Sequence, residues 1–378
     1  MKKGLLSVFL LVLLIMVSTA FAGATPIKLG LVGPMTEGLA PYGEGVRDGA
    51  LLAVAEINAK GGIMGRQVEL IVYDNQGDPT QTINLVNRLI SQDRIVGLIG
   101  PVISSTSRVA GPVVQRHGIP MITPTATAVD VTLAGDYIFR VCFLDSYQGA
   151  AAVNYALETG AKKAGILFKA GDPYSVGLRD VFKANFEKAG GTVLDLAYNS
   201  GDTDFSAQLT RMKNEGVDVV YAPYYYDDAV LSLAQANAIG LEAPFIGTDG
   251  WDSQDLLDHV GLAAVGTVIT THYSPSDERE KVQNFLANFR SSYGHSPIVL
   301  AALGYDAAGL MLDAIERAQS VNSEQIRNAI AETEGFYGVT GENITLDSNR
   351  NPIKDITIIR VIEVDGVPQF EFVTQVGY

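Results

Sequence analysis

The sequence predicts an α/β protein with two doubly wound, Rossmann-like lobes joined by a hinge of short extended strands. From residue 27 onward, short apolar runs rich in β-branched residues alternate with segments of helical periodicity, which is the βαβ order of parallel sheets. The chain after residue 22 keeps 356 of the 378 residues, more than one hydrophobic core normally supports. No low-complexity linker interrupts it, so we expect the lobes to be connected by a hinge.

The N-terminal segment predicts export. Lys2 and Lys3 precede an apolar run from Val8 to Val17, and Ala20-Phe21-Ala22 forms a small-residue cleavage site. The apolar run is too short to span a bilayer comfortably. We therefore expect a cleaved signal peptide at residues 1–22 and a periplasmic protein. The only cysteine, Cys142, is far from the cleavage site, so we expect neither a lipoprotein nor an intrachain disulfide.

The first predicted lobe begins with strands at residues 27–33, 68–73, 95–99 and 119–122. A helix at 43–59 places Val46, Ala50 and Val54 on one face and ends at Gly61-Gly62. A second helix follows Asp78-Pro79, because aspartate caps a helix and proline fits its first turn.

The same pattern repeats from about residue 145. Helices are expected at 145–159, 176–189 and 205–213, and strands at 164–168, 192–198 and 217–222. Helices at 278–292 and 298–317 precede a strand at 356–364, so we infer that the chain recrosses between lobes there. The expected boundaries are 23–143 with 273–348 for lobe 1, and 144–272 with 349–378 for lobe 2.

Charge and motif content argue against several classes of protein. Without Lys2 and Lys3 the formal charge moves from −15 to −17, which repels nucleic acids and anionic lipids. The glycines at 43, 45 and 49 do not match the GxGxxG spacing of a dinucleotide site. None of the four histidines has a partner at metal-ligand spacing, and each is expected on the surface or in the interior rather than in a site. We therefore expect no metal, no cofactor and no enzyme.

Two strand ends carry candidate anion-binding groups. Residues 100–107 end a strand and start a helix, so the hydroxyls of Ser104 and Ser105 meet free backbone N–H groups at the carboxyl edge of the sheet. Thr125, Ala126 and Thr127 follow the next strand in the same way. A ligand carboxylate fits such a place, although serines that only cap the helix would explain the same pattern.

The second lobe offers a countercharge and aromatic rings. Asp249 follows the strand-like run 245–247 and can pair with an ammonium group, or it is a turn residue before Gly250. Tyr174 and the run Tyr224-Tyr225-Tyr226 follow other strands, and rings of this kind enclose ligands. Three consecutive tyrosines cannot all point inward.

Several blocks in the right order resemble one known family. They are Ile27 to Pro34 followed by Gly43, residues 56–63 with Gly65, and Tyr73-Asp74 with Asp78-Pro79. The chain resembles the periplasmic leucine/isoleucine/valine-binding proteins, the type I solute-binding proteins of ABC importers. The resemblance implies the type I periplasmic binding protein fold, three crossovers between the lobes, a ligand between them, and a membrane permease as partner.

The resemblance also implies roles for individual residues. Positions matching Ser104, Ala126 and Thr127 hold the α-carboxylate and part of the ammonium group. Tyr174 and Tyr225 match ligand-contacting positions, Tyr42 replaces a tryptophan, and Tyr273 is a further candidate. Relatives often carry glutamate where this chain has Asp249, which leaves the identity of the ligand open.

The expected function is capture of an amino acid, branched-chain or otherwise hydrophobic, by a monomer that delivers it to an ABC importer. An amide, urea or an aromatic acid is an alternative ligand. Delivery of the ligand to a sensory receptor is an alternative role, and a secreted hydrolase is the remaining alternative class.

Overall fold

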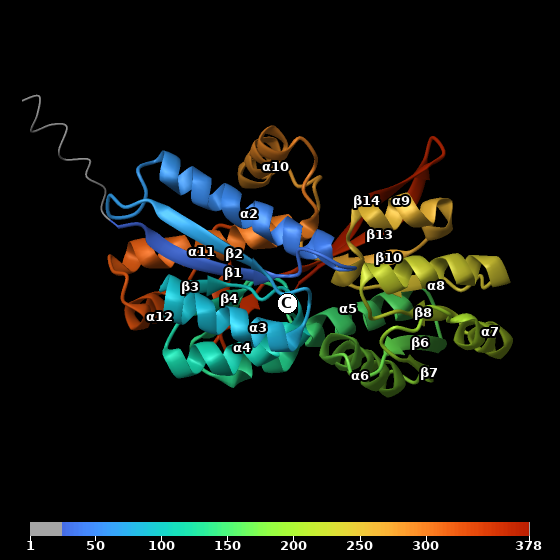
Figure 1. Cartoon of the computed structure of the whole chain (residues 1–378). Coiled ribbons are helices and arrows are strands. Elements are labelled where there is room, and N and C mark those ends of the chain that lie inside the picture. Colours follow the sequence, from blue (N-terminus) through green and yellow to red (C-terminus); the bar gives the residue numbers. More distant parts are fainter. Residues whose placement is uncertain (1–24, 378) are drawn as a thin grey trace, which may run out of the picture.

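The computed structural model describes residues 25–377 and contains two open sheets with helices on both faces. Figure 1 shows the two sheets and their helices as two bodies side by side, and we call them the first and second lobe. The predicted signal peptide at 1–22 lies outside the described residues. The predicted lobe boundaries remain a prediction.

The first lobe is built on a parallel five-stranded sheet in the order β2-β1-β3-β4-β5. Its strands are β1 (Ile27–Gly33), β2 (Val68–Asp74), β3 (Gly97–Ile99), β4 (Met121–Thr123) and β5 (Ile138–Arg140). Its helices are α2 (Ala40–Ala59), α3 (Pro79–Arg88), α4 (Ser104–His117), α10 (Glu280–Tyr293), α11 (Val299–Ala318) and α12 (Ser323–Ala331).

The second lobe is built on a seven-stranded sheet in the order β14-β13-β10-β9-β8-β6-β7. Its parallel strands are β6 (Lys163–Lys169), β7 (Thr192–Tyr198), β8 (Val219–Tyr221), β9 (Phe245–Gly247) and β10 (Val268–Thr271). The antiparallel strands β13 (Ile356–Val364) and β14 (Val367–Val376) complete it. Its helices are α5 (Asp145–Glu158), α6 (Pro173–Lys188), α7 (Ser206–Glu215), α8 (Tyr226–Ile239) and α9 (Gln254–Val260).

Both faces of each sheet are covered, which confirms the doubly wound prediction. In the first lobe, Leu29 and Leu31 lie in the apolar cluster formed with α2 and α11, whereas Val32 and Leu98 lie in the cluster formed with α4. This split follows from the alternation of side chains along a strand. The short ribbon of β11 (Thr345–Leu346) and β12 (Pro352–Ile353) precedes the last crossing into β13.

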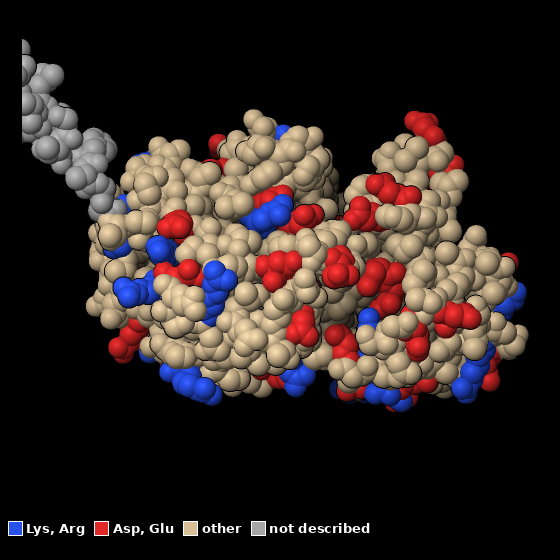
Figure 2. Space-filling view, in the orientation of Figure 1, with Lys and Arg blue, Asp and Glu red and all other residues tan. Residues whose placement is uncertain are grey.

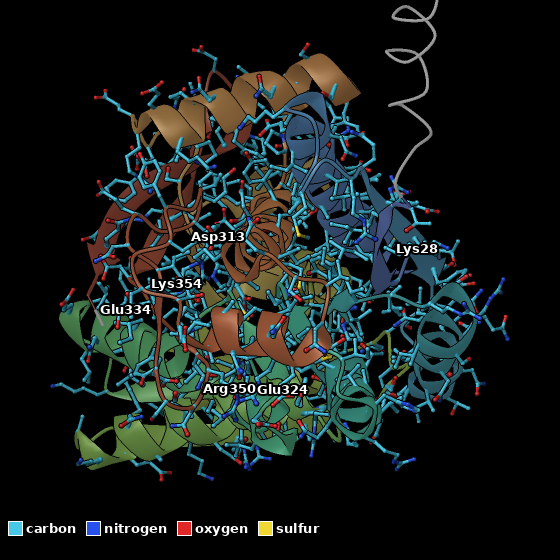
Figure 3. All side chains as sticks on the ribbon, turned by 90° about the vertical axis from the view of Figure 1, so that its left-hand side faces the viewer. Lys28, Asp313, Glu324, Glu334, Arg350 and Lys354 are labelled. Carbon is cyan, nitrogen blue, oxygen red and sulfur yellow. The ribbon has the colours of Figure 1, made fainter. Side chains whose placement is uncertain are left out.

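The chain passes between the lobes after β5, after β10 and before β13. Lys354 from the third passage, labelled in Figure 3, is buried and donates hydrogen bonds to the carbonyl of Val141 (3.2 Å) and to Oγ1 of Thr340 (2.8 Å). Val141 belongs to the first passage, so the passages are tied to each other. This arrangement fits a hinge made of adjacent strands.

The face shown in Figure 2 carries many acidic side chains, over both lobes. This distribution accords with the formal charge of −15 and the sequence pI near 4.7. Among residues 25–377, no helix is long and apolar enough to cross a membrane.

Candidate functional site

A cavity of about 20 Å³ lies where the two lobes face each other. The first lobe contributes Tyr42, Val102, Ile103, Thr125 and Leu300 to its wall, and the second contributes Tyr174, Tyr225, Asp249 and Gly250. The cavity therefore collects residues from the carboxyl ends of strands in both sheets, where ligands of open α/β sheets bind. Five of the predicted site residues line it: Tyr42, Thr125, Tyr174, Tyr225 and Asp249.

The first-lobe wall continues into the uncapped N-terminus of α4. The N-cap residue is Ile103, which supplies no side-chain hydrogen bond to the first turn. Ser104 is buried, and its Oγ accepts a hydrogen bond from the backbone N–H of Ala128 (3.3 Å), while Ser105 is half-buried in the same turn. The serines therefore do not act as the N-cap, and the positive end of the helix dipole faces the gap beside Ile103.

The loop after β4 runs beside this helix end. The Thr125 hydroxyl donates to the carbonyl of Val102, which joins the loop to the residues before α4. Ala126 is fully buried, and its carbonyl accepts from the Arg140 guanidinium (2.8 Å). The Thr127 hydroxyl is buried and has no hydrogen-bond partner among the described residues, so a ligand atom can take that place.

Asp249 stands at the start of a 3₁₀ turn that follows β9, and only 4% of its surface is exposed. Its Oδ1 accepts from Nε2 of Gln148 (2.9 Å) and from the Tyr174 hydroxyl (2.6 Å). Its Oδ2 lies 3.2 Å from Nε2 of His272. The carboxylate is thus held by neighbours from three separate segments, which a free turn residue would not need.

A second buried carboxylate, Asp145, lies in the first turn of α5 and was not a predicted site residue. Neither of its oxygens has a hydrogen-bond partner among the described residues. Burial raises the pKa of Asp145 well above its usual value, and the charge of Asp249 raises it further. The Thr127 hydroxyl and the Arg140 guanidinium oppose this shift, although the hydroxyl does not reach hydrogen-bond geometry.

The charge of Asp249 acts unfavourably on the buried and unpaired Asp145, so a cation near these carboxylates would be stabilising. A ligand ammonium beside Asp145 and Asp249 would offset both desolvation and repulsion. Among the described residues there is no cluster of histidine, cysteine, aspartate and glutamate side chains that could hold a metal ion. A buried carboxylate of this kind forms charge-assisted hydrogen bonds with an organic ammonium group.

Three tyrosine rings occupy the space between the lobes. Tyr174 and Tyr225 are stacked with centroids 4.9 Å apart, and Tyr42 meets Tyr225 edge to face at 5.7 Å. Burial raises the pKa of all three, so the hydroxyls stay neutral. Of the other tyrosines in the run, Tyr224 is buried and donates to Ser232 (2.8 Å), and Tyr226 reaches Gly38 of the first lobe (2.9 Å).

The position of Tyr273 differs from the expectation, and that of its neighbour His272 adds to it. Tyr273 does not line this cavity: its ring is buried in the first-lobe core, and it borders two other cavities. His272, one of the histidines expected on the surface or in the interior, is buried, and its Nε2 lies beside Asp249. Adjacent residues of an extended segment point to opposite sides, so only one of the two can face Asp249.

Comparison with known proteins accords with this geometry. A family profile described as periplasmic binding protein matches residues 26–366. The chain belongs to the periplasmic binding protein family. Its members are solute-binding proteins of the periplasm rather than a class of enzymes.

Relatives agree in sequence and in structure. The Leu/Ile/Val-binding protein BraC3 of Rhizobium johnstonii is 33% identical over 86% of this chain and 91% of its own length. The leucine-binding protein LivK of Thermotoga maritima has a TM-score of 0.87 and 33% identity, over 93% of this chain and 99% of that one. LivJ of Streptococcus pneumoniae, solved with isoleucine, has a TM-score of 0.85 and 31% identity, over 92% and 99%. The resemblance and the fold class expected from the sequence are confirmed.

Proposed function

We propose that this periplasmic binding protein captures an α-amino acid with an apolar side chain between its lobes and delivers it to an ABC importer. The single observation that carries the proposal is the buried carboxylate of Asp249, which lines the same cavity as Ile103 at the uncapped end of α4. An α-amino acid is a zwitterion, and its two charges match these two sides of the gap.

The rest of the wall favours an apolar ligand side chain. Val102, Ile103 and Leu300 contribute aliphatic carbons, and the tyrosines contribute ring faces. Asp249 is the only charged residue in this wall, so a charged ligand side chain would find no partner there. The names of the Rhizobium and Thermotoga relatives and the isoleucine in the Streptococcus structure support the same class of ligand.

Binding requires the lobes to separate and close. A cavity of about 20 Å³ has room for about one water molecule. An amino acid therefore enters an arrangement in which the tyrosines stand apart, binds to the first lobe, and is buried when the second lobe returns. The contacts made only after closure bias the equilibrium towards the closed form.

We infer further that residues 1–22 are removed on export and that the mature protein is a monomer without a lipid anchor. The lobe boundaries are proposed to be 143/144, 272/273 and 348/349. The protein releases its ligand unaltered, so incubation with ligand followed by mass spectrometry should return the same compound.

Isothermal titration calorimetry tests the proposal directly. The purified protein should bind leucine, isoleucine or valine with micromolar affinity, about 8 kcal/mol. 4-Methylpentanoate, which lacks the ammonium group, should bind at least about 30-fold more weakly than leucine, since an ion-pair partner is lost. Tighter binding of an aromatic acid, an amide or urea than of any amino acid would contradict the proposal.

Asp249→Ala is expected to weaken amino-acid binding by at least about 2 kcal/mol, roughly 30-fold, because it leaves a buried ammonium with one partner fewer. Glu334→Ala is the matched control, since Glu334 is an exposed acid that follows α12 of the first lobe and does not line the cavity (labelled in Figure 3). An unchanged affinity in Asp249→Ala would refute the assigned role of this carboxylate.

A further inference from the structure

The contacts of His272 connect the hinge to the carboxylate of Asp249. His272 follows β10 at the second passage between the lobes. Its imidazole is stacked on the ring of Phe143 from the first passage, with centroids 3.7 Å apart and an angle of 19°. On its other side, Nε2 lies 3.2 Å from Oδ2 of Asp249.

The chemistry of this contact fixes the direction of the hydrogen bond. An ionised carboxylate only accepts hydrogen bonds, so Nε2 must carry the proton and donate. Nδ1 has no partner among the described residues, and only 2% of the residue is exposed. Burial lowers the pKa of His272 to about 4, against the opposing hydrogen bond and charge of Asp249 and with the charge of Lys354 acting in the same direction as burial. The imidazole is therefore a neutral donor at the pH of the periplasm.

The hydrogen bonds of Asp249 leave room for one more donor. A carboxylate offers about four lone-pair positions. Gln148 and Tyr174 occupy two on Oδ1, and His272 occupies one on Oδ2. The remaining position is on Oδ2, the oxygen for which His272 is the only hydrogen-bond partner among the described residues.

We propose that His272 is a positioning residue for ammonium recognition, which holds Oδ2 of Asp249 from the hinge side so that its free lone pair faces the ligand. The inference rests on the proposed function. This role explains why the ring at this position is an imidazole. A phenylalanine could stack on Phe143 equally well but could not donate a hydrogen bond to Asp249.

Two substitutions separate donation from stacking. His272→Phe keeps a ring against Phe143 and removes the donor, whereas His272→Gln places an amide N–H near the position of Nε2 and removes the ring. With leucine as the probe in calorimetry, His272→Phe should lose about 10-fold or more in affinity, and His272→Gln should regain most of it. A loss of less than 2-fold in His272→Phe would overturn the proposal.

A double-mutant cycle with Asp249→Asn distinguishes positioning from a general effect on the fold. If His272 acts through Asp249, the cost of His272→Phe should shrink to less than about 2-fold when Asp249→Asn is already present. A cost of equal size in both backgrounds would assign His272 a merely structural role. Should His272→Phe fail to give a native circular dichroism spectrum, His272→Leu takes its place in the cycle with the same expectations.

The outcomes also distinguish this inference from the function on which it rests. If the wild-type protein binds no amino acid, the proposed function fails and the inference fails with it. If the wild-type protein binds leucine and His272→Phe binds it equally well, only the role of His272 is lost.

Discussion

At the scale of single residues, the structure separates side chains of the same type by their surroundings. Asp78 and Asp172 cap helices, accepting from Gln81 (2.6 Å) and Ser175 (2.9 Å). Asp145 begins a helix too, but it is buried and its carboxylate has no hydrogen-bond partner among the described residues. Sequence gives no means to tell these cases apart, because an acid in the first turn of a helix has a sufficient local explanation. Only the tertiary fold brings Asp145 near Asp249.

This position leads to a prediction for Asp145→Asn. Removing the charge should lower the affinity for an amino acid by about 1.5–3 kcal/mol, the range for a hydrogen bond to a charged group. It should also raise the stability of the ligand-free protein, since a buried, unpaired carboxylate is costly. Calorimetry and urea unfolding measure the two effects. Lower stability together with unchanged affinity would contradict a role in ligand binding.

The burial of His272 predicts how the stability of the fold depends on pH. Its pKa is lowered to about 4 in the folded protein, whereas an unfolded histidine has a pKa near 6.5. Between these values the unfolded chain binds more protons, so this residue lowers the stability of the fold as pH falls from 6.5 towards 4. A shift of 2.5 units corresponds to about 3 kcal/mol.

Urea unfolding of the ligand-free protein at pH 7.5 and at pH 4.5 measures this effect. Between the two pH values, the free energy of unfolding should fall more in the wild type than in His272→Gln. The difference should be most of the roughly 3 kcal/mol that the pKa shift corresponds to. Asp249 and Lys354 are charged neighbours present in both proteins, so the difference isolates the imidazole. Equal losses would mean that folding does not lower the pKa of His272.

At the scale of helices and strands, hydrophobic periodicity predicted well which elements exist and whether each is a helix or a strand. It predicted less well the residues at which they begin and end. The strand expected at 356–364 coincides with β13, and the helix expected at 43–59 begins one turn earlier, at Ala40. The earlier start follows from Pro41, which is tolerated in a first turn. The strand pattern could not reveal which of Tyr224, Tyr225 and Tyr226 faces the cavity, because these residues lie in a loop and at a helix start.

The N-terminal ends of α2 and α8 meet across the gap between the lobes and are joined by hydrogen bonds. Tyr226, in the first turn of α8, donates from its hydroxyl to the carbonyl of Gly38 just before α2 (2.9 Å). Its backbone N–H donates to the Tyr42 hydroxyl (3.3 Å), which in turn donates to the carbonyl of Gly250. These hydrogen bonds exist only while the lobes are together.

Tyr226→Phe should therefore speed ligand release. The side-chain bond to Gly38 is exposed, so its loss should cost about 0.5–1 kcal/mol, or a 2- to 5-fold faster dissociation in stopped-flow fluorescence. Tyr155→Phe is the matched control, because the Tyr155 hydroxyl accepts from Arg360 within the second lobe (3.0 Å). Equal effects of the two substitutions would mean that the Gly38 contact does not restrain opening.

At the scale of the whole molecule, binding and closure should be one equilibrium that scattering can follow. In this structure the wall residues of both lobes are in contact, and the cavity between them is about 20 Å³. A population of open molecules must exist for a ligand to enter, so the ligand-free protein should have a larger average radius of gyration than the closed form described here.

A saturating amino acid should reduce the radius of gyration measured by small-angle X-ray scattering. It should also stabilise the fold by about 2.7 kcal/mol at 100 times Kd, seen as a higher Tm. In Asp249→Ala the first lobe can still bind the carboxylate while the bond that favours closure is missing. At equal fractional saturation this variant should therefore close less than the wild type. Identical contraction of the two proteins would show that closure is driven by contacts other than those of Asp249, because a ligand shifts an equilibrium only through the contacts that differ between its two states.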